Sequence, residues 1–172
     1  MKAFGVAGGS GSGKTTLLKR LIPELVSRGV CVSTVKHAHH EFDIDLPGKD
    51  SYEHRAAGAT EVLVSSARRW AVVHELRGEA ELTLANILTR MSPVDLVLIE
   101  GFKSEGHDKL EVHRPSLGKA PLYPSDPSVV AVASDEPITG LRLPRLALDD
   151  VTSIADFVLE HCGLARARTR VV

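Results

Sequence analysis

The stretch that decides the fold is KAFGVAGGSGSGKTTLL, residues 2–18. It starts with a short apolar run over 2–7, passes through a Gly/Ser-rich segment, and from Lys14 shows apolar residues at helical spacing. The next run, 30–35, is rich in β-branched residues and predicts a second strand. A strand, a glycine loop, a helix and a strand in this order predict a βαβ unit with parallel strands.

The glycine loop carries a phosphate-binding pattern. Residues 8–15, GGSGSGKT, fit the P-loop or Walker A motif G-x-x-x-x-G-K-[ST]. Glycines permit positive φ angles, so backbone N–H groups can surround a polyphosphate, and the following helix attracts anions to its N-terminus. Lys14 is expected to reach the β- and γ-phosphates, and Thr15 to coordinate Mg²⁺. The motif predicts a nucleoside triphosphate site made by Gly9, Ser10, Gly11, Ser12, Gly13, Lys14, Thr15 and Thr16.

A metal ion beside the triphosphate needs an acidic residue at the end of another parallel strand. The run VDLVLIE, residues 94–100, predicts a central strand buried on both faces, and it ends on Glu100. Glu100 and Thr15 are therefore the predicted magnesium ligands. A second acid could come from the loop 36–50, where spacing does not choose among Asp43, Asp45 and Asp50; Asp45 is carried forward as the candidate.

The loop KHAHHEFDIDLPGKD, residues 36–50, is long and polar and has no periodicity, which is typical of a functional segment. Its local positive charge would suit an anionic ligand or a protein partner near the triphosphate. A metal site at the histidines is an alternative, although no cysteine lies nearby to complete a set of three or four ligands. Solvated loop side chains are the simpler interpretation. The candidate ligand or partner residues are Lys36, His37, His39, His40, Lys49 and Arg55.

Base specificity has a weaker signal, because the chain lacks the N-K-x-D element that reads guanine in many GTPases. The tripeptide ASD, residues 133–135, follows a predicted strand. The Asp135 carboxylate there could accept hydrogen bonds from the guanine N1–H and exocyclic amine. An aspartate that merely opens a loop fits the same pattern.

The remaining periodicity predicts one domain. Helices are expected over 51–57 (with Ser51 as N-cap), 79–90 and 148–162, the last capped by Asp149 or Asp150. Strands are expected over 61–64 and 70–75 as an antiparallel pair, and over 110–113 and 129–133; the proline-rich residues 115–127 predict a loop. We predict an α/β fold of P-loop NTPase type, with a mostly parallel sheet flanked by helices and some antiparallel strands. It forms a single nucleotide-binding domain over 1–163, followed by a basic, frayed tail over 164–172.

Composition narrows the function classes. Among 172 residues, Lys and Arg number 21 and Asp and Glu 22, so the net charge of −1 argues against a general nucleic-acid binder. No apolar run approaches the ~20 residues of a membrane span, and the N-terminus has no signal-peptide pattern. Two cysteines, Cys31 and Cys162, are too few for a disulfide framework. A cytoplasmic protein that contacts neither nucleic acid nor membrane is the expectation.

Four segments together resemble the molybdopterin-guanine dinucleotide biosynthesis protein B family: VAGGSGSGKTTLL (6–18), VKHAHHEFDIDLPGKDSYEHRAAGA (35–59), DLVLIEGFK (95–103) and ASD (133–135). The P-loop is shared by many families, whereas residues 36–59 and EGFK (100–103) are more specific. The resemblance implies a GTP- and Mg²⁺-binding homodimer with weak GTPase activity. It further implies a role beside a partner, molybdopterin guanylyltransferase, which joins GMP to molybdopterin in molybdenum cofactor biosynthesis. An anionic pterin phosphate could then approach the loop 36–55.

Two other functions stay open at this point. A P-loop small-molecule ligase or kinase resembling dethiobiotin synthetase would also place a strand-end glutamate before a glycine. A metal-insertion GTPase similar to the nickel chaperones would require the loop histidines to bind metal. Turnover with candidate acceptors and metal titration would separate these two from an adapter.

Overall fold

The chain folds as two compact units in the computed structural model, which describes residues 1–38, 42–102 and 104–164. Among the described residues, 1–37, 92–102 and 104–164 form the larger unit, and 38 and 42–91 form the smaller one. In the sequence, the smaller unit is inserted between strands β2 (Val32–Lys36) and β5 (Leu96–Glu100) of the larger one. This division was not predicted from the sequence. Within the ranges just given, no helix is long and apolar enough to cross a membrane.

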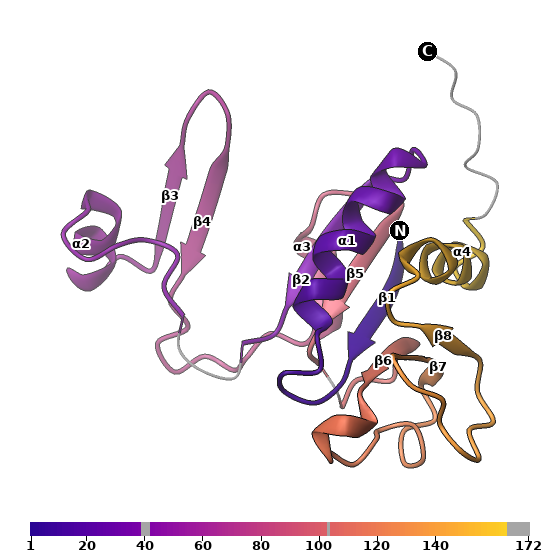
Figure 1. The fold of residues 1–172 in the computed structure, drawn as a ribbon. Coiled ribbons are helices and arrows are strands. Elements are labelled where there is room, and N and C mark those ends of the chain that lie inside the picture. The colour runs from indigo at the N-terminus through magenta and orange to yellow at the C-terminus, as the bar shows by residue number, and fades with distance from the viewer. Residues whose placement is uncertain (39–41, 103, 165–172) are drawn as a thin grey trace. The chain divides into compact units, whose positions relative to one another are not determined.

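A six-stranded sheet forms the centre of the larger unit (Figure 1). Its strand order is β2-β5-β1-β6-β7-β8, and every neighbouring pair is parallel. Besides β2 and β5, the strands are β1 (Lys2–Ala7), β6 (Lys109–His113), β7 (Val129–Ser134) and β8 (Arg145–Ala147). The predicted mostly parallel P-loop fold is confirmed; the short strand β8 was not predicted.

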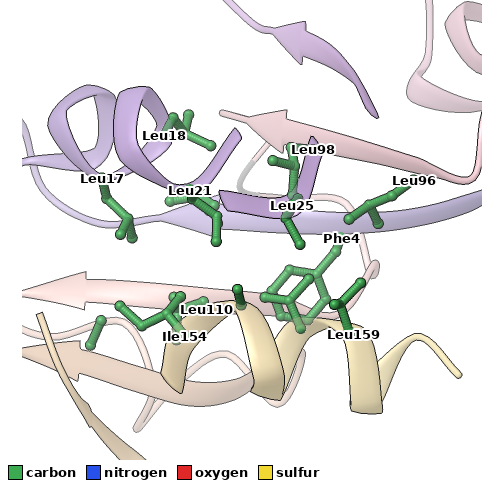
Figure 2. Close-up of a cluster of buried hydrophobic side chains, with 14 of the residues drawn as sticks. Phe4, Leu17, Leu18, Leu21, Leu25, Leu96, Leu98, Leu110, Ile154 and Leu159 are labelled. Atoms are coloured by element: carbon green, nitrogen blue, oxygen red, sulfur yellow. The ribbon is translucent and has the colours of Figure 1, made fainter. Parts of the chain in front are cut away.

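Helices α1 (Lys14–Ser27) and α4 (Val151–His161) pack on one face of this sheet. Alternate residues of β1, β5 and β6 point toward them, and Figure 2 shows the resulting cluster of buried side chains. The helix predicted over 148–162 begins at Val151, because the Asp150 side chain accepts a hydrogen bond from the Ser153 amide (3.0 Å) and caps it. The cluster includes Phe4, Leu96, Leu98 and Leu110 from the strands, Leu17, Leu21 and Leu25 from α1, and Ile154 and Leu159 from α4.

The opposite face of the sheet buries two charged side chains of β6. Lys109 donates to the Glu105 carbonyl (2.8 Å) and to the Asp126 carboxylate (3.2 Å). Glu111 accepts from the backbone amides of residues 122 and 123 at 2.7 and 2.9 Å. Both are 1% exposed, so these contacts fix the proline-rich segment 114–128, with its short 3-10 helix η1 (Pro115–Leu117), against the sheet.

The smaller unit contains helix α2 (Asp50–Ala56), strands β3 (Glu61–Ser65) and β4 (Trp70–His74), and helix α3 (Leu84–Arg90). Strands β3 and β4 form the predicted antiparallel pair. The predicted N-cap Ser51 was wrong, because α2 is capped at Lys49 and starts one residue before Ser51. Helix α3 is shorter than the predicted 79–90, since the Thr83 side chain accepts from the Asn86 amide and starts the helix after it.

Candidate functional site

Glycines with positive φ angles shape the turn between β1 and α1, which is the predicted phosphate-binding loop. Gly8, Gly11 and Gly13 have φ angles of 141°, 77° and 102°, which side-chain-bearing residues rarely adopt. A β-carbon at Gly8 would lie 2.3 Å from the Val112 carbonyl oxygen, so the loop also needs glycine for its close approach to β6. Gly13 is the N-cap of α1 and offers no side-chain acceptor to the first-turn amides, which suits an anion there.

The side chain of Lys14 folds back over this loop. Its ammonium group donates to the carbonyl oxygens of Gly8 (3.0 Å) and Gly9 (2.8 Å). The charge is thus held over the same turn that the glycines shape. This is the place from which a P-loop lysine reaches the β- and γ-phosphates of a nucleotide.

Two oxygen ligands suited to Mg²⁺ lie together beside the loop. Strands β1 and β5 are neighbours, and Glu100 stands at the carboxyl end of β5 next to the start of α1. The Thr15 hydroxyl donates to Glu100 Oε1 at 3.4 Å. Hydroxyl and carboxylate oxygens are the hard ligands that Mg²⁺ takes in nucleotide sites, so these residues fit the ion. Their role as its ligands stays a prediction.

The residues that follow Glu100 hold it in a strained, tightly packed turn. Gly101 has a φ of 99°, and a β-carbon there would lie 2.7 Å from His37 Cβ. Phe102 has a φ of 48°, rare for a residue with a side chain, and its ring stacks on the imidazole of His37 with centroids 4.4 Å apart. The His37 amide donates to the Glu100 carbonyl (2.8 Å). His37 therefore supports the end of β5; its predicted contact with a ligand is untested.

A pocket of about 240 Å³ opens beside the start of α1. Arg114 is one of its lining residues; its guanidinium pairs with the Asp135 carboxylate, and its Nε donates to the Ser12 carbonyl (3.0 Å). The parallel topology thereby brings Asp135, the predicted base-reading residue, to the P-loop. The lining residues are Gly13, Thr16, Leu17, Arg20, Arg114, Asp135, Leu148 and Asp149.

A second cation contacts the loop from the segment after β6. The ammonium group of Lys119 donates to the Ser10 carbonyl at 2.6 Å. Lys119 is exposed, and its aliphatic chain lies against Gly9. The loop carbonyls of residues 8, 9, 10 and 12 are therefore all contacted by Lys14, Lys119 or Arg114.

In the smaller unit, Arg55 is surrounded by carboxylates. It donates to Asp43 and Asp45, both at 2.8 Å, and to Glu75 at 2.5 Å, and it lies over the ring of Tyr52. The hydrogen bond from Arg55 lowers the pKa of Asp45. Two residues predicted for different roles, Arg55 for an anionic ligand and Asp45 for a metal, are thus ion-pair partners.

The other residues of the predicted loop are only partly described. Lys36 ends β2 beside Glu100 in register, and Lys49 precedes α2. His39 and His40 lie outside the described residues. Within residues 1–38, 42–102 and 104–164, no group of three or more His, Cys, Asp or Glu side chains is arranged to hold a metal ion.

Comparison with known proteins places the chain in a family. Residues 3–135 match the family described as molybdopterin guanine dinucleotide synthesis protein B, or MobB. The chain belongs to the MobB family. This confirms the resemblance found in the sequence.

Its MobB relatives extend over most of the chain. It is 48% identical over 154 residues to the molybdopterin-guanine dinucleotide biosynthesis adapter protein of Escherichia coli, covering 88% of this chain and 87% of the relative. It is 42% identical over 168 residues to the protein of the same name from Haemophilus influenzae, covering 95% and 92%. A MobB crystal structure at 30% identity superposes with a TM-score of 0.73, covering 94% of this chain and 99% of that one.

Two site residues of this MobB chain were missed by the sequence analysis. Arg114 directly follows the predicted strand over 110–113. Because ligands bind at the carboxyl ends of parallel strands, this position could have identified Arg114 as a candidate site residue. Lys119 lies in the loop of residues 115–127, which carries no periodicity, and its contact with Ser10 spans 109 positions of sequence. No sequence pattern could have found that contact.

Proposed function

We propose that this chain is a GTP-binding adapter with weak GTPase activity that assists the attachment of GMP to molybdopterin. The observation that carries the proposal is the P-loop, in which the Lys14 ammonium group lies on the carbonyls of Gly8 and Gly9 beside the Thr15–Glu100 pair. The family adds support, because the MobB relatives from Escherichia coli and Haemophilus influenzae are named adapter proteins of molybdopterin-guanine dinucleotide biosynthesis.

Nucleotide binding is tested by isothermal titration of GTP in the presence of Mg²⁺. We expect Lys14→Ala to weaken binding at least tenfold, because it removes a charge-assisted contact to the β- and γ-phosphates. Lys19→Ala is the matched control, since Lys19 is an exposed lysine of the same helix. Equal affinity of Lys14→Ala and the wild type, with both folded by circular dichroism, would rule out this use of the P-loop.

The preference for guanine rests on Asp135 in the pocket at the start of α1. Its carboxylate can accept from guanine N1–H and the exocyclic amine, which adenine does not offer in that arrangement. Asp135→Asn should lower affinity for GTP and raise affinity for xanthosine triphosphate, whose second ring carbonyl accepts from the new amide. A loss of both affinities would instead mean that Asp135 acts only by holding Arg114.

The proposed GTPase activity is slow hydrolysis of GTP that uses Mg²⁺ held by Thr15 and Glu100. Release of inorganic phosphate from GTP, measured with and without the guanylyltransferase, tests it. Rapid turnover of a small-molecule acceptor in the same assay would favour the ligase or kinase function instead.

The adapter role requires contact with molybdopterin guanylyltransferase, which co-purification and a GTP-dependent cofactor-assembly assay measure. We propose that Lys36 and Lys49 supply charge for the pterin phosphate or for the partner. The double variant Lys36→Ala/Lys49→Ala should impair assembly and leave GTP binding near normal. Stoichiometric binding of Zn²⁺ or Ni²⁺ in equilibrium dialysis, with assembly unimpaired, would favour metal insertion.

We also propose that the chain is a homodimer whose copies meet through the hairpin β3–β4. Leu63 and Val72 face each other across this hairpin and are 63% and 40% exposed, and Trp70, two residues along the same face, is 67% exposed. A two-stranded sheet gains little stability alone, and an exposed apolar face of this kind favours association. Leu63→Glu should convert a dimer to a monomer in light scattering, whereas Arg68→Glu in the connecting turn should not.

A further inference from the structure

We propose that Lys119 is a second phosphate-binding lysine, directed at the γ-phosphate end of the P-loop from the segment 114–128. The inference rests on the proposed binding of GTP and adds a residue that the P-loop motif does not contain. Four observations carry it: the contact of its ammonium group, the position of the pocket, the packing of its aliphatic chain, and the anchoring of the segment that presents it.

The ammonium groups of Lys119 and Lys14 lie on consecutive carbonyls of one loop. Lys14 donates to the carbonyls of Gly8 and Gly9, and Lys119 donates to that of Ser10 at 2.6 Å. A P-loop lysine in this place serves the β- and γ-phosphates. A cation on the next carbonyl therefore lies within reach of the same phosphate oxygens.

The position of the pocket defines which phosphate Lys119 would meet. The pocket that suits the base is lined by Gly13, Thr16 and Asp135, at the helical end of the loop. A nucleotide with its base there runs its phosphates away from the pocket and across the loop toward the Lys14 ammonium group. Ser10 is not among the residues that line the pocket, and it directly follows Gly8 and Gly9, whose carbonyls hold the Lys14 ammonium group. Lys119 would therefore meet the terminal phosphate rather than the α-phosphate.

The glycine at position 9 is explained by Lys119. The φ of Gly9 lies outside the left-handed region, so its backbone does not call for glycine. A β-carbon at Gly9 would lie 3.0 Å from Lys119 Cδ, and its three nearest neighbours would all be atoms of Lys119. The loop thus leaves room for the aliphatic chain of one particular lysine.

The segment that presents Lys119 is anchored at both ends. Arg114 at its start donates to the Ser12 carbonyl, and buried Glu111 accepts from the amides of Leu122 and Tyr123 beyond it. Gly118, with a φ of 62°, closes a turn by donating its amide to Pro115 (3.0 Å). Lys119 is therefore held beside the P-loop by a segment that is already fixed. This lowers the conformational entropy that Lys119 would lose on contacting a phosphate.

The test compares affinities for GTP and GDP, measured by calorimetry with Mg²⁺ for the wild type, Lys119→Ala, Lys119→Arg and the control Lys19→Ala. Removing a charged contact to the γ-phosphate should weaken GTP binding by about tenfold or more. The affinity for GDP, which has no γ-phosphate, should change less than about threefold. Lys119→Arg should retain most of the GTP affinity, because it keeps the charge.

The outcomes separate this inference from the proposed function. Equal losses for GTP and GDP would mean that Lys119 only positions the loop, and unchanged GTP affinity would mean that it does nothing; either result overturns the inference while GTP binding stands. A wild-type protein that binds neither nucleotide overturns the proposed function and this inference together.

A double-mutant cycle tests the packing separately from the charge. Gly9→Ala should weaken GTP binding in the wild type, because it displaces the Lys119 chain, and should cost little in the Lys119→Ala background. Equal losses in both backgrounds would overturn the link between Gly9 and Lys119.

Discussion

The conformation of Gly8 offers a quantitative test of the loop geometry. Substitution by alanine would place a β-carbon 2.3 Å from the Val112 carbonyl oxygen and 2.9 Å from Ser12 Oγ, at a φ of 141°. The nearer atom belongs to the backbone of β6 and cannot rotate away. Gly11→Ala is the matched control, because Gly11 also has a positive φ, 77°, but a β-carbon there meets nothing within 4 Å.

The two variants should differ by the cost of that contact. Backbone strain costs each about 1–2 kcal/mol. Forcing a methyl group into the packed space at Gly8 adds about 1–3 kcal/mol. Gly8→Ala should therefore lower the free energy of unfolding by about 2–5 kcal/mol, and Gly11→Ala by about 1–2 kcal/mol.

Urea titrations followed by far-UV circular dichroism measure both values, because α1 and α4 of the larger unit contribute strongly to that signal. GTP affinity of the folded fraction, measured alongside, should fall more for Gly8→Ala, which moves the carbonyl that Lys14 contacts. Equal destabilisation by the two substitutions would refute the close approach of the loop to β6.

Three further predictions concern single side chains. Glu100→Gln should weaken Mg²⁺-dependent GTP binding by about tenfold and spare Mg²⁺-independent binding, because it removes the predicted anionic metal ligand; identical calorimetric Mg²⁺ titrations for variant and wild type would contradict this. Burial, and secondarily the charge of Lys109, lowers the pKa of His107 in the folded protein. As the pH falls through the usual histidine pKa of ~6.5, the unfolded chain therefore binds more protons at His107 than the folded protein does, and the free energy of unfolding decreases. Urea midpoints between about pH 7.5 and 5.5 should therefore shift less in His107→Gln than in the wild type. Glu111→Ala should lower the free energy of unfolding by about 2–4 kcal/mol, since two amides lose their acceptor, and an unchanged urea midpoint would exclude this.

The elements predicted correctly from sequence are those with a strong local signal. The apolar runs over 2–7, 110–113 and 129–133 are strands of the buried parallel sheet, and the helical spacing after Lys14 is α1. Strand β8 has only three residues, lies at the sheet edge and is at most half buried, so no periodicity marks it. Helix α3 was extended too far because Leu82 fits the helical pattern although it precedes the cap Thr83.

The same distinction applies to the candidate site. The P-loop is one contiguous segment, so the role of each of its residues could be predicted from local sequence. Glu100 could be predicted as a metal ligand because it ends an apolar strand. Lys119 and the pocket residues Leu148 and Asp149 come from segments far along the chain, which only the folded sheet brings to the P-loop and to the start of α1. The pairing of Asp45 with Arg55 likewise depends on how the loop 42–49 folds against α2.

The two buried charges of β6 also specify how the sheet is assembled. Leu110 and Val112 point into the core beside α1 and α4, whereas Lys109 and Glu111 point to the other face, where each has its polar partners. A slip of one residue in strand pairing would reverse these directions. It would place an ammonium group and a carboxylate beside Phe4 and Leu21 with no partner, at a cost of several kcal/mol for each ion. A strand made only of leucine and valine would carry no such penalty, so the charges make the native register of β6 with β1 the one that the chain selects during folding.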